Sequence, residues 1–219
     1  MSRIIIFANG NLTQPDRLRA LLRPTDRIFC ADGGTRHALT LGLTPDVIIG
    51  DLDSLPPDIA AQMETAGVDI RRYPVRKDET DLELALRAAL AENPTEIVLL
   101  TALGGRLDQM LANILLLTRP EYAAVSLSLF DGDCWAMLLR SHQAISLTGQ
   151  PGDTLSLIPL TPMVNRVTLT GVEWPLDRAT LSMGSTLTVS NAFAEPMVSV
   201  QIGEGLVLVV HFDKEQSSR

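Results

Sequence analysis

Cysteine, aromatic residues and basic charge are all scarce in this chain. Two of its 219 residues are cysteines, Cys30 and Cys134, and each lies in an apolar stretch, so we expect reduced core residues rather than a disulfide. The formal net charge at pH 7 is -8. Because a protein dedicated to nucleic acids usually carries a basic face, we expect no nucleic-acid partner.

Long apolar runs are also missing. No stretch approaches the roughly 20 residues that a membrane-spanning helix needs, and the apolar run at 3–8 is shorter than the core of a signal peptide. We therefore expect a cytoplasmic protein with no membrane partner.

Three common site motifs are absent as well. The chain has no Gly-x-x-x-x-Gly-Lys-Ser/Thr loop, no Gly-x-Gly-x-x-Gly turn and no Gly-x-Ser-x-Gly elbow. These absences exclude a Walker-type nucleotide site and argue against a dinucleotide site. The three histidines are scattered along the chain, and we interpret each as a surface or core residue: His37, His142 and His211.

The first 130 residues alternate short apolar runs with segments of helical period. This alternation predicts a three-layer α/β domain with a mostly parallel sheet. The expected strands are 3–8, 27–31, 46–49, 68–72, 96–102 and 126–130. The expected helices are 15–23, 34–42, 56–66, 80–92 and 106–118.

Beyond residue 134 the pattern changes to short runs rich in Val, Leu and Thr, separated by glycines. Such spacing is typical of an antiparallel sandwich. The expected strands are 135–139, 144–147, 154–158, 166–169, 180–181, 186–189, 197–201 and 206–212. We therefore predict two domains, an α/β domain over 1–133 and an all-β sandwich over 134–219.

Two carboxylates follow the apolar run at 46–49. Asp51 and Asp53 stand one residue apart, so side-chain alternation at a strand end would point them the same way. Like charges this close repel unless something neutralises them, and oxygen ligands favour a hard divalent cation. The pair therefore predicts a metal site.

Several polar motifs follow the expected strands and precede helices. Ligands of open parallel sheets bind at the carboxyl ends of the strands, and helix amino termini attract phosphate. Arg106 adds a guanidinium that can hold phosphate oxygens. Helix capping or a first-turn charge remains the alternative interpretation for Asp32, Asp81 and Asp108. Lys77 and Arg76 are ambiguous, because basic residues on loops are usually solvated. The motifs are Asn9-Gly10-Asn11, Ala31-Asp32-Gly33-Gly34-Thr35, Gly50-Asp51-Leu52-Asp53-Ser54 and Leu103-Gly104-Gly105-Arg106-Leu107-Asp108.

Together with motifs further along the chain, these segments resemble the thiamine pyrophosphokinase family. The resemblance covers most of the chain in order. Its further motifs are Lys77-Asp78-Glu79-Thr80-Asp81, Asp108-Gln109, Gly171-Val172-Glu173-Trp174-Pro175-Leu176 and Thr188-Val189-Ser190-Asn191.

The resemblance implies a homodimer with sites between subunits, which uses Mg2+ and ATP to convert thiamine to thiamine diphosphate and AMP. It implies a nucleotide-binding catalytic domain followed by a thiamine-binding domain. By matching position, the catalytic residues are Asp51, Asp53, Asp81 and Arg106, of which the three aspartates bind the metal. The nucleotide-binding residues are Asp32, Gly33, Gly34, Asp78, Thr80, Arg106, Asp108 and Gln109. The substrate-binding residues are Asp81, Ser190, Asn191 and Phe193, with Phe193 as the stacking aromatic and Asp81 as the candidate general base.

Two other functions remain open at this point. One is a diphosphokinase for another small alcohol such as a hydroxymethyl pterin, and the other is a non-catalytic module that senses a nucleotide or thiamine. The Ser190-Asn191 pair favours thiamine, and the number of carboxylates argues against a mere sensor.

Overall fold

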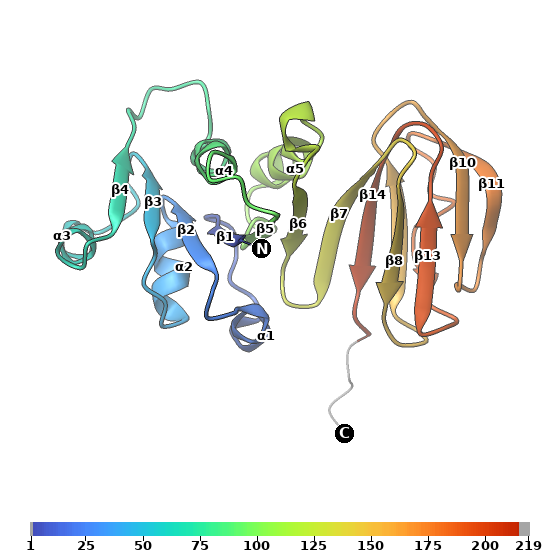
Figure 1. Cartoon of the computed structure of the whole chain (residues 1–219), viewed down its shortest axis with the longest axis horizontal. Coiled ribbons are helices and arrows are strands. Elements are labelled where there is room, and N and C mark those ends of the chain that lie inside the picture. The colour runs from blue at the N-terminus through green and yellow to red at the C-terminus, as the bar shows by residue number, and fades with distance from the viewer. Residues whose placement is uncertain (1, 215–219) are drawn as a thin grey trace. The chain divides into compact units, whose positions relative to one another are not determined.

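The computed structural model describes residues 2–214 of the chain. Its contacts divide the chain into two compact units, Met1–Gly132 and Asp133–Arg219 (Figure 1). Among the described residues, no helix is long and apolar enough to cross a bilayer. Cys30 and Cys134 are both buried and free, as expected.

The first unit is built on a parallel sheet. Its strands follow the order β6-β5-β1-β2-β3-β4, and every neighbouring pair runs parallel. Because β1 has β2 on one side and β5 on the other, the strand order reverses between β1 and β5. The strands are β1 (Arg3–Phe7), β2 (Arg27–Ala31), β3 (Val47–Gly50), β4 (Asp69–Arg72), β5 (Glu96–Leu100) and β6 (Ser126–Phe130).

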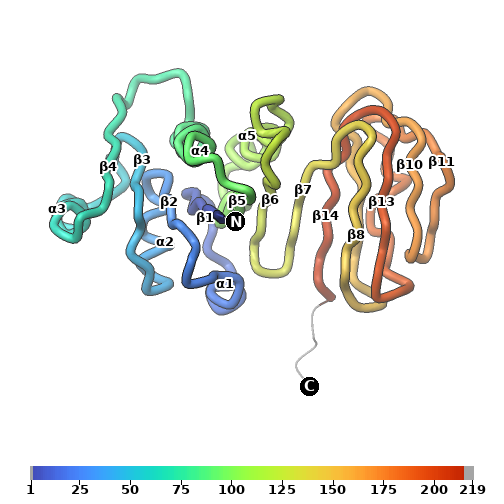
Figure 2. Tube along the Cα trace, in the orientation of Figure 1, coloured from blue at the N-terminus to red at the C-terminus, as the bar shows by residue number. Residues whose placement is uncertain are grey.

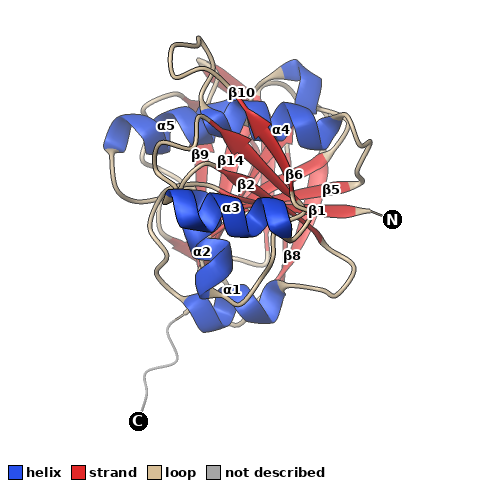
Figure 3. Cartoon of the chain, turned by 90° about the vertical axis from the view of Figure 1, so that its left-hand side faces the viewer, coloured by secondary structure: helices blue, strands red, loops and turns tan. Residues whose placement is uncertain are grey.

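Five helices connect these strands and cover both faces of the sheet. Right-handed crossovers place the first three helices on one face and the last two on the other, as Figure 3 shows. The helices are α1 (Pro15–Leu21), α2 (Gly34–Thr40), α3 (Pro57–Thr65), α4 (Asp81–Leu90) and α5 (Leu107–Leu116), and a short 3-10 helix η1 (Pro120–Tyr122) precedes β6. Each predicted helix and strand of this unit is present within two residues of its expected bounds.

The central strands are apolar because both of their faces are covered. Every residue of β1 is buried, and Ile5, Ile6 and Phe7 have no exposed surface. At α4, the Thr80 hydroxyl accepts a hydrogen bond from the Glu83 amide at 3.2 Å and so caps the amino terminus of the helix.

The second unit is a sandwich of two antiparallel sheets, ordered β12-β9-β14-β7 and β11-β10-β13-β8. Apolar residues from both sheets form one core, which includes Leu157, Val167, Val200 and Val209. The strands are β7 (Cys134–Arg140), β8 (Ala144–Thr148), β9 (Thr154–Pro159), β10 (Met163–Thr170), β11 (Leu176–Ser182), β12 (Asn191–Ala192), β13 (Met197–Gln201) and β14 (Leu206–Phe212).

The strand expected at 186–189 is wrong. This segment forms turns, and Leu187 is 71% exposed. Thr188 is the residue that faces inward, where its hydroxyl donates to the Leu157 carbonyl at 2.6 Å and its carbonyl accepts the Leu157 amide at 3.0 Å. The segment is therefore held to β9 by one residue, and regular pairing with β9 begins only at Asn191.

A buried ion pair joins β1 to the loop that precedes β2. Arg3 donates to both carboxylate oxygens of Asp26, at 2.8 and 2.6 Å, and the Asp26 side chain has no exposed surface. Burial alone would raise the pKa of Asp26, but hydrogen bonds from Arg3 and the Arg23 amide outweigh burial and lower it. Removing one partner would leave the other charge buried and unpaired.

We predict that Arg3→Met lowers the free energy of unfolding by about 3 kcal/mol at pH 7, measured by urea denaturation. Asp26 has a lowered pKa, so its stabilisation is complete above its unfolded pKa near 4 and is lost as the pH falls through the lower folded value. The difference between the two proteins should therefore shrink below about pH 4. The control Arg19→Met removes an exposed pair with Asp16 and should cost less than about 1 kcal/mol.

Candidate functional site

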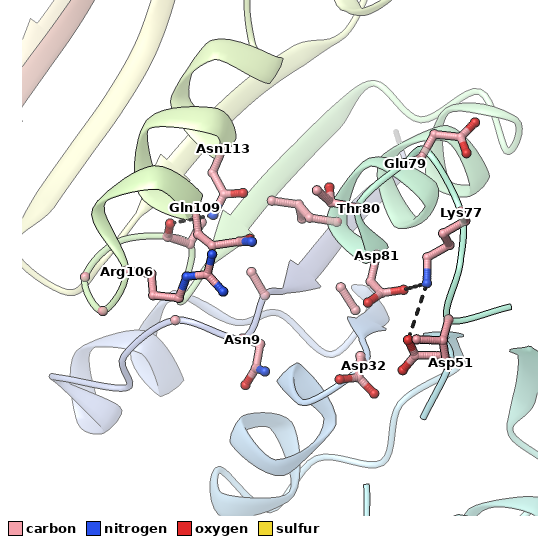
Figure 4. Close-up of a pocket in the computed structure, with 18 residues that line it drawn as sticks. Asn9, Asp32, Asp51, Lys77, Glu79, Thr80, Asp81, Arg106, Gln109 and Asn113 are labelled. Carbon is pink, nitrogen blue, oxygen red and sulfur yellow. Dashed lines mark hydrogen bonds and ion pairs between the residues drawn. The ribbon is translucent and has the colours of Figure 1, made fainter. Parts of the chain in front are cut away.

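A cavity of about 560 Å³ opens at the carboxyl edge of the parallel sheet. Segments that follow β1, β2, β3 and β5 line it, together with the loop between β4 and α4, which Figure 2 traces. The point where the strand order reverses is where open α/β sheets bind ligands. The polar lining residues, most of them labelled in Figure 4, are Asn9, Asp32, Asp51, Lys77, Glu79, Thr80, Asp81, Arg106, Gln109 and Asn113.

Three carboxylates gather at one end of the cavity. Asp32, Asp51 and Asp53 each offer an oxygen within 4.8 Å of the others. Asp32 is buried, and its Oδ1 has no hydrogen-bond partner among the described residues. A buried carboxylate oxygen without a partner is costly, and three converging carboxylates suit a hard divalent cation. The cluster therefore fits a metal site.

The predicted metal pair meets through a turn rather than through strand alternation. β3 ends at Gly50, and Leu52 has a positive φ of 62°. The Asp53 amide then donates to the Asp51 carboxylate at 3.1 Å. The prediction that strand alternation points Asp51 and Asp53 the same way is thus wrong, because β3 ends at Gly50, one residue before Asp51.

Gly50 permits this crowding of charged residues. Its φ is 153°, and a Cβ there would lie 2.9 Å from Asp32 Cβ and 3.1 Å from Asp81 Oδ1. Gly34 makes a similar close approach, since a Cβ there would lie 2.1 Å from the Phe7 carbonyl. Both glycines therefore bring neighbouring segments together without lining the cavity themselves.

Asp81 begins α4 and forms an ion pair with Lys77. Lys77 Nζ lies 2.9 Å from Asp81 Oδ1 and 3.7 Å from Asp51 Oδ2. Burial raises the pKa of Asp81, helped by the charges of Asp32 and Asp51 and opposed by Lys77. Desolvation would lower the pKa of Lys77, but hydrogen bonds and attraction from the two carboxylates outweigh it and raise that pKa.

The other end of the cavity is lined by the Gly104-Gly105 turn and the start of α5. Arg106 is exposed and donates to both oxygens of Asp108, at 3.1 and 2.5 Å. This hydrogen bonding holds the pKa of Asp108 below its usual range. Asn113 is buried and fixes the turn by donating to the Ala102 carbonyl at 2.8 Å.

The structure thus brings together most of the residues expected at the sheet edge. Four polar residues of the lining were not assigned from the sequence: Asn9, Lys77, Glu79 and Asn113. The Asn9-Gly10 motif was a usable signal for Asn9, whereas nothing local to Lys77 shows that its loop returns to the sheet. The residues that line the cavity as expected are Asp32, Asp51, Thr80, Asp81, Arg106 and Gln109. Expected residues outside its lining are Gly33, Gly34, Asp53, Asp78 and Asp108.

In the second unit, Phe193 is not available as a stacking surface. Its ring is 1% exposed in the sandwich core and stacks on His211, with centroids 4.8 Å apart. Asn191 is also buried. Its side-chain Nδ2 donates to the backbone carbonyl of Trp174 at 2.8 Å, and its Oδ1 accepts a hydrogen bond from the backbone amide of Trp174 at 3.2 Å. Trp174 is 60% exposed. Asn191 therefore fixes the backbone that carries the exposed indole of Trp174.

Comparisons with known proteins agree with this arrangement. The family model "Thiamin pyrophosphokinase, catalytic domain" matches residues 18–129, and "Thiamin pyrophosphokinase, vitamin B1 binding domain" matches 142–207. The chain belongs to the thiamine pyrophosphokinase family. The two matched segments lie in the first and the second unit respectively.

Individual family members are moderately similar to the chain. It is 29% identical to thiamine pyrophosphokinase of Bacillus subtilis (strain 168) over 82% of this chain and 84% of that protein. A crystal structure of thiamine pyrophosphokinase from Bacillus subtilis superposes with a TM-score of 0.87 at 26% identity, covering 97% of this chain and 100% of that chain. The thiamin pyrophosphokinase structure from Geobacillus thermodenitrificans gives 0.85 at 27% identity, covering 98% and 99%.

Asp32→Asn should raise the free energy of unfolding by about 1 kcal/mol in a metal-free buffer, measured by urea denaturation, because it neutralises a buried carboxylate whose Oδ1 has no hydrogen-bond partner among the described residues. Asparagine tolerates the positive φ of 43° at this position. The same variant should bind Mg2+ more weakly in calorimetry. Asp177→Asn, on an exposed residue of β11, should change neither quantity. A destabilised Asp32→Asn would contradict the interpretation.

Proposed function

We propose that this protein is a thiamine diphosphokinase, which transfers the diphosphoryl group of ATP to the hydroxyl of thiamine and releases AMP. The observation that carries the proposal is the carboxylate cluster around the partnerless Oδ1 of Asp32, in one cavity with a glycine turn and Arg106, in a member of this family. The first unit is then the nucleotide-binding catalytic domain, and the second is the thiamine-binding domain.

The carboxylates hold the metal end of the site. The carboxylate oxygens of Asp32, Asp51 and Asp53 converge there. Asp81 lies at the same end of the cavity, where it forms an ion pair with Lys77. A Mg2+ ion bound there would neutralise phosphate oxygens of ATP. Because carboxylates repel phosphate, they would hold the triphosphate at this end of the cavity only through that ion.

Arg106 and Gln109 serve the phosphate end. Arg106 is exposed, and its partner Asp108 lies two residues away on the same helix turn, so the guanidinium can reach the cavity by side-chain rotation alone. A guanidinium stabilises the charge that develops on phosphate oxygens during transfer. Thr80 and Asp78 belong to the segment that starts α4, and Thr80 lines the cavity.

Asp81 is the proposed general base for the thiamine hydroxyl. Burial raises its pKa, and a base becomes more effective as its pKa approaches the working pH. Lys77 opposes this shift by stabilising the carboxylate form.

Thiamine recognition is assigned to the second unit. Ser190 has a positive φ of 60°, its amide donates to the Ser156 hydroxyl at 3.0 Å, and it precedes Asn191, which holds the exposed Trp174. An exposed indole whose backbone is fixed in this way is a suitable stacking surface for the rings of thiamine, which carry positive charge. Trp174 replaces Phe193 in this role.

The first test is AMP formation from ATP and thiamine with Mg2+. Asp51→Asn should lower kcat by roughly 10²–10³-fold, because one carboxylate that neutralises charge in the transition state is lost. Asp58→Asn, on an exposed residue in the first turn of α3, should keep wild-type turnover. Turnover with a hydroxymethyl pterin but not with thiamine would contradict the assigned acceptor, and no AMP with either would contradict the proposal.

The second test concerns the proposed homodimer, whose active sites lie between subunits. One face of α5 carries three exposed leucines at helical spacing, Leu107, Leu111 and Leu115, which are 66%, 49% and 53% exposed. A stripe of this kind on a surface helix is typical of an interface. Leu111→Glu should convert the dimer to a monomer in light scattering, whereas Leu187→Glu, in an exposed loop, should not. A monomeric wild-type protein would contradict the prediction.

A further inference from the structure

Lys77 is the cation that the structure itself places among the carboxylates. It lies in the loop between β4 and α4, and its side chain is only 11% exposed. Its Nζ reaches Asp81 Oδ1 at 2.9 Å and Asp51 Oδ2 at 3.7 Å, as the dashed lines in Figure 4 show. A loop lysine is normally solvated, so this inward position requires an explanation.

We propose that Lys77 is a built-in counter-cation, which pairs with Asp51 and Asp81 in the metal-free protein and leaves them when a divalent cation binds. The displaced ammonium is then free to contact the phosphate chain of the nucleotide. This inference rests on the proposed function for the identity of the metal and the phosphate ligand, but not for the competition between the two cations.

The first argument is that the carboxylate cluster and the ion pair with Lys77 share the carboxylate of Asp51. Asp51 belongs to the group with Asp32 and Asp53 that can hold a divalent cation, and it is also paired with Lys77. One ammonium carries a single charge, and Asp32 Oδ1 stays without a hydrogen-bond partner among the described residues. A divalent ion would satisfy the cluster better, so it competes with Lys77 for Asp51.

The second argument is that Lys77 can move while its loop stays in place. Arg87 donates to Glu79 at 3.1 Å, and the Thr80 hydroxyl caps α4, so both residues anchor the loop next to Lys77. Lysine has a flexible four-carbon stem and a compact charge with three donors. Rotation of this stem is sufficient to carry the ammonium from the carboxylates into the cavity that Lys77 already lines.

The experiment is Mg2+ binding by calorimetry with no nucleotide or thiamine present. Lys77→Met and Lys77→Gln should bind Mg2+ about tenfold more tightly than the wild-type protein, because a competing charge at close range is removed. Lys77→Arg, which keeps the charge, should stay close to wild type. Arg76→Met removes a positive charge from an exposed neighbour in the same loop and is the matched control, with at most a small change expected.

Thermal unfolding gives a second readout that does not depend on activity. Without Mg2+, Lys77→Met should unfold at a lower temperature than wild type, because Asp51 and Asp81 lose their counter-charge, and Mg2+ should raise its midpoint by more than it raises that of wild type. Lys77→Gln covers the case in which the methionine variant does not fold.

Three results would overturn the proposal. Unchanged Mg2+ affinity in both neutral variants would mean that Lys77 does not compete with the metal, and weaker affinity would mean that it helps to build the metal site. Absence of Mg2+ binding in both the wild-type protein and the Lys77 variants would also overturn it. A protein that shows the expected Mg2+ competition but forms no AMP would leave the counter-cation in place and contradict only the proposed function.

Discussion

Electrostatic repulsion among carboxylates at the ends of β2 and β3 and at the start of α4 is the constraint on which the rest of this site depends. Asp32, Asp51 and Asp81 come from three separate segments, and Gly50 lets them approach where a side chain would separate them. Carboxylates this close repel one another unless positive charge lies among them. Lys77 turns inward among these carboxylates, and the charges of Asp32 and Asp51 add to the burial that raises the pKa of Asp81. Asp32 Oδ1 stays without a hydrogen-bond partner among the described residues.

The parallel sheet positions the cavity, and the segments that follow its strands carry most of the polar side chains that line it. Reversal of strand order between β1 and β5 leaves room at the carboxyl edge, and every segment of the cavity enters from that edge. The second unit contributes a different kind of surface, in which the buried Asn191 holds the exposed Trp174 by its backbone. The carboxylate cluster and the exposed Trp174 therefore belong to different compact units of the chain.

Local patterns were sufficient for most of the fold. Segments of helical period located the helices of the first unit, and short apolar runs located its buried strands. Features that depend on packing could not be predicted from the sequence. Thr188 turns inward where a strand was expected at 186–189, and Phe193 is buried against His211 rather than exposed. Asp51 and Asp53 were correctly paired for the wrong reason, because strand alternation does not reveal a turn that starts at Leu52. Lys77 was missed because its partners are set by the path of a loop.

The convergence of ligands from separate strands also has a consequence for the life of the folded chain. No short segment carries the cluster, so an ion or nucleotide held there binds only when β2, β3 and α4 are assembled. Any such ligand stabilises the native state by mass action, in proportion to the logarithm of its concentration over its dissociation constant. Substrate supply would therefore set the lifetime of this protein against unfolding and proteolysis, as well as its rate of turnover.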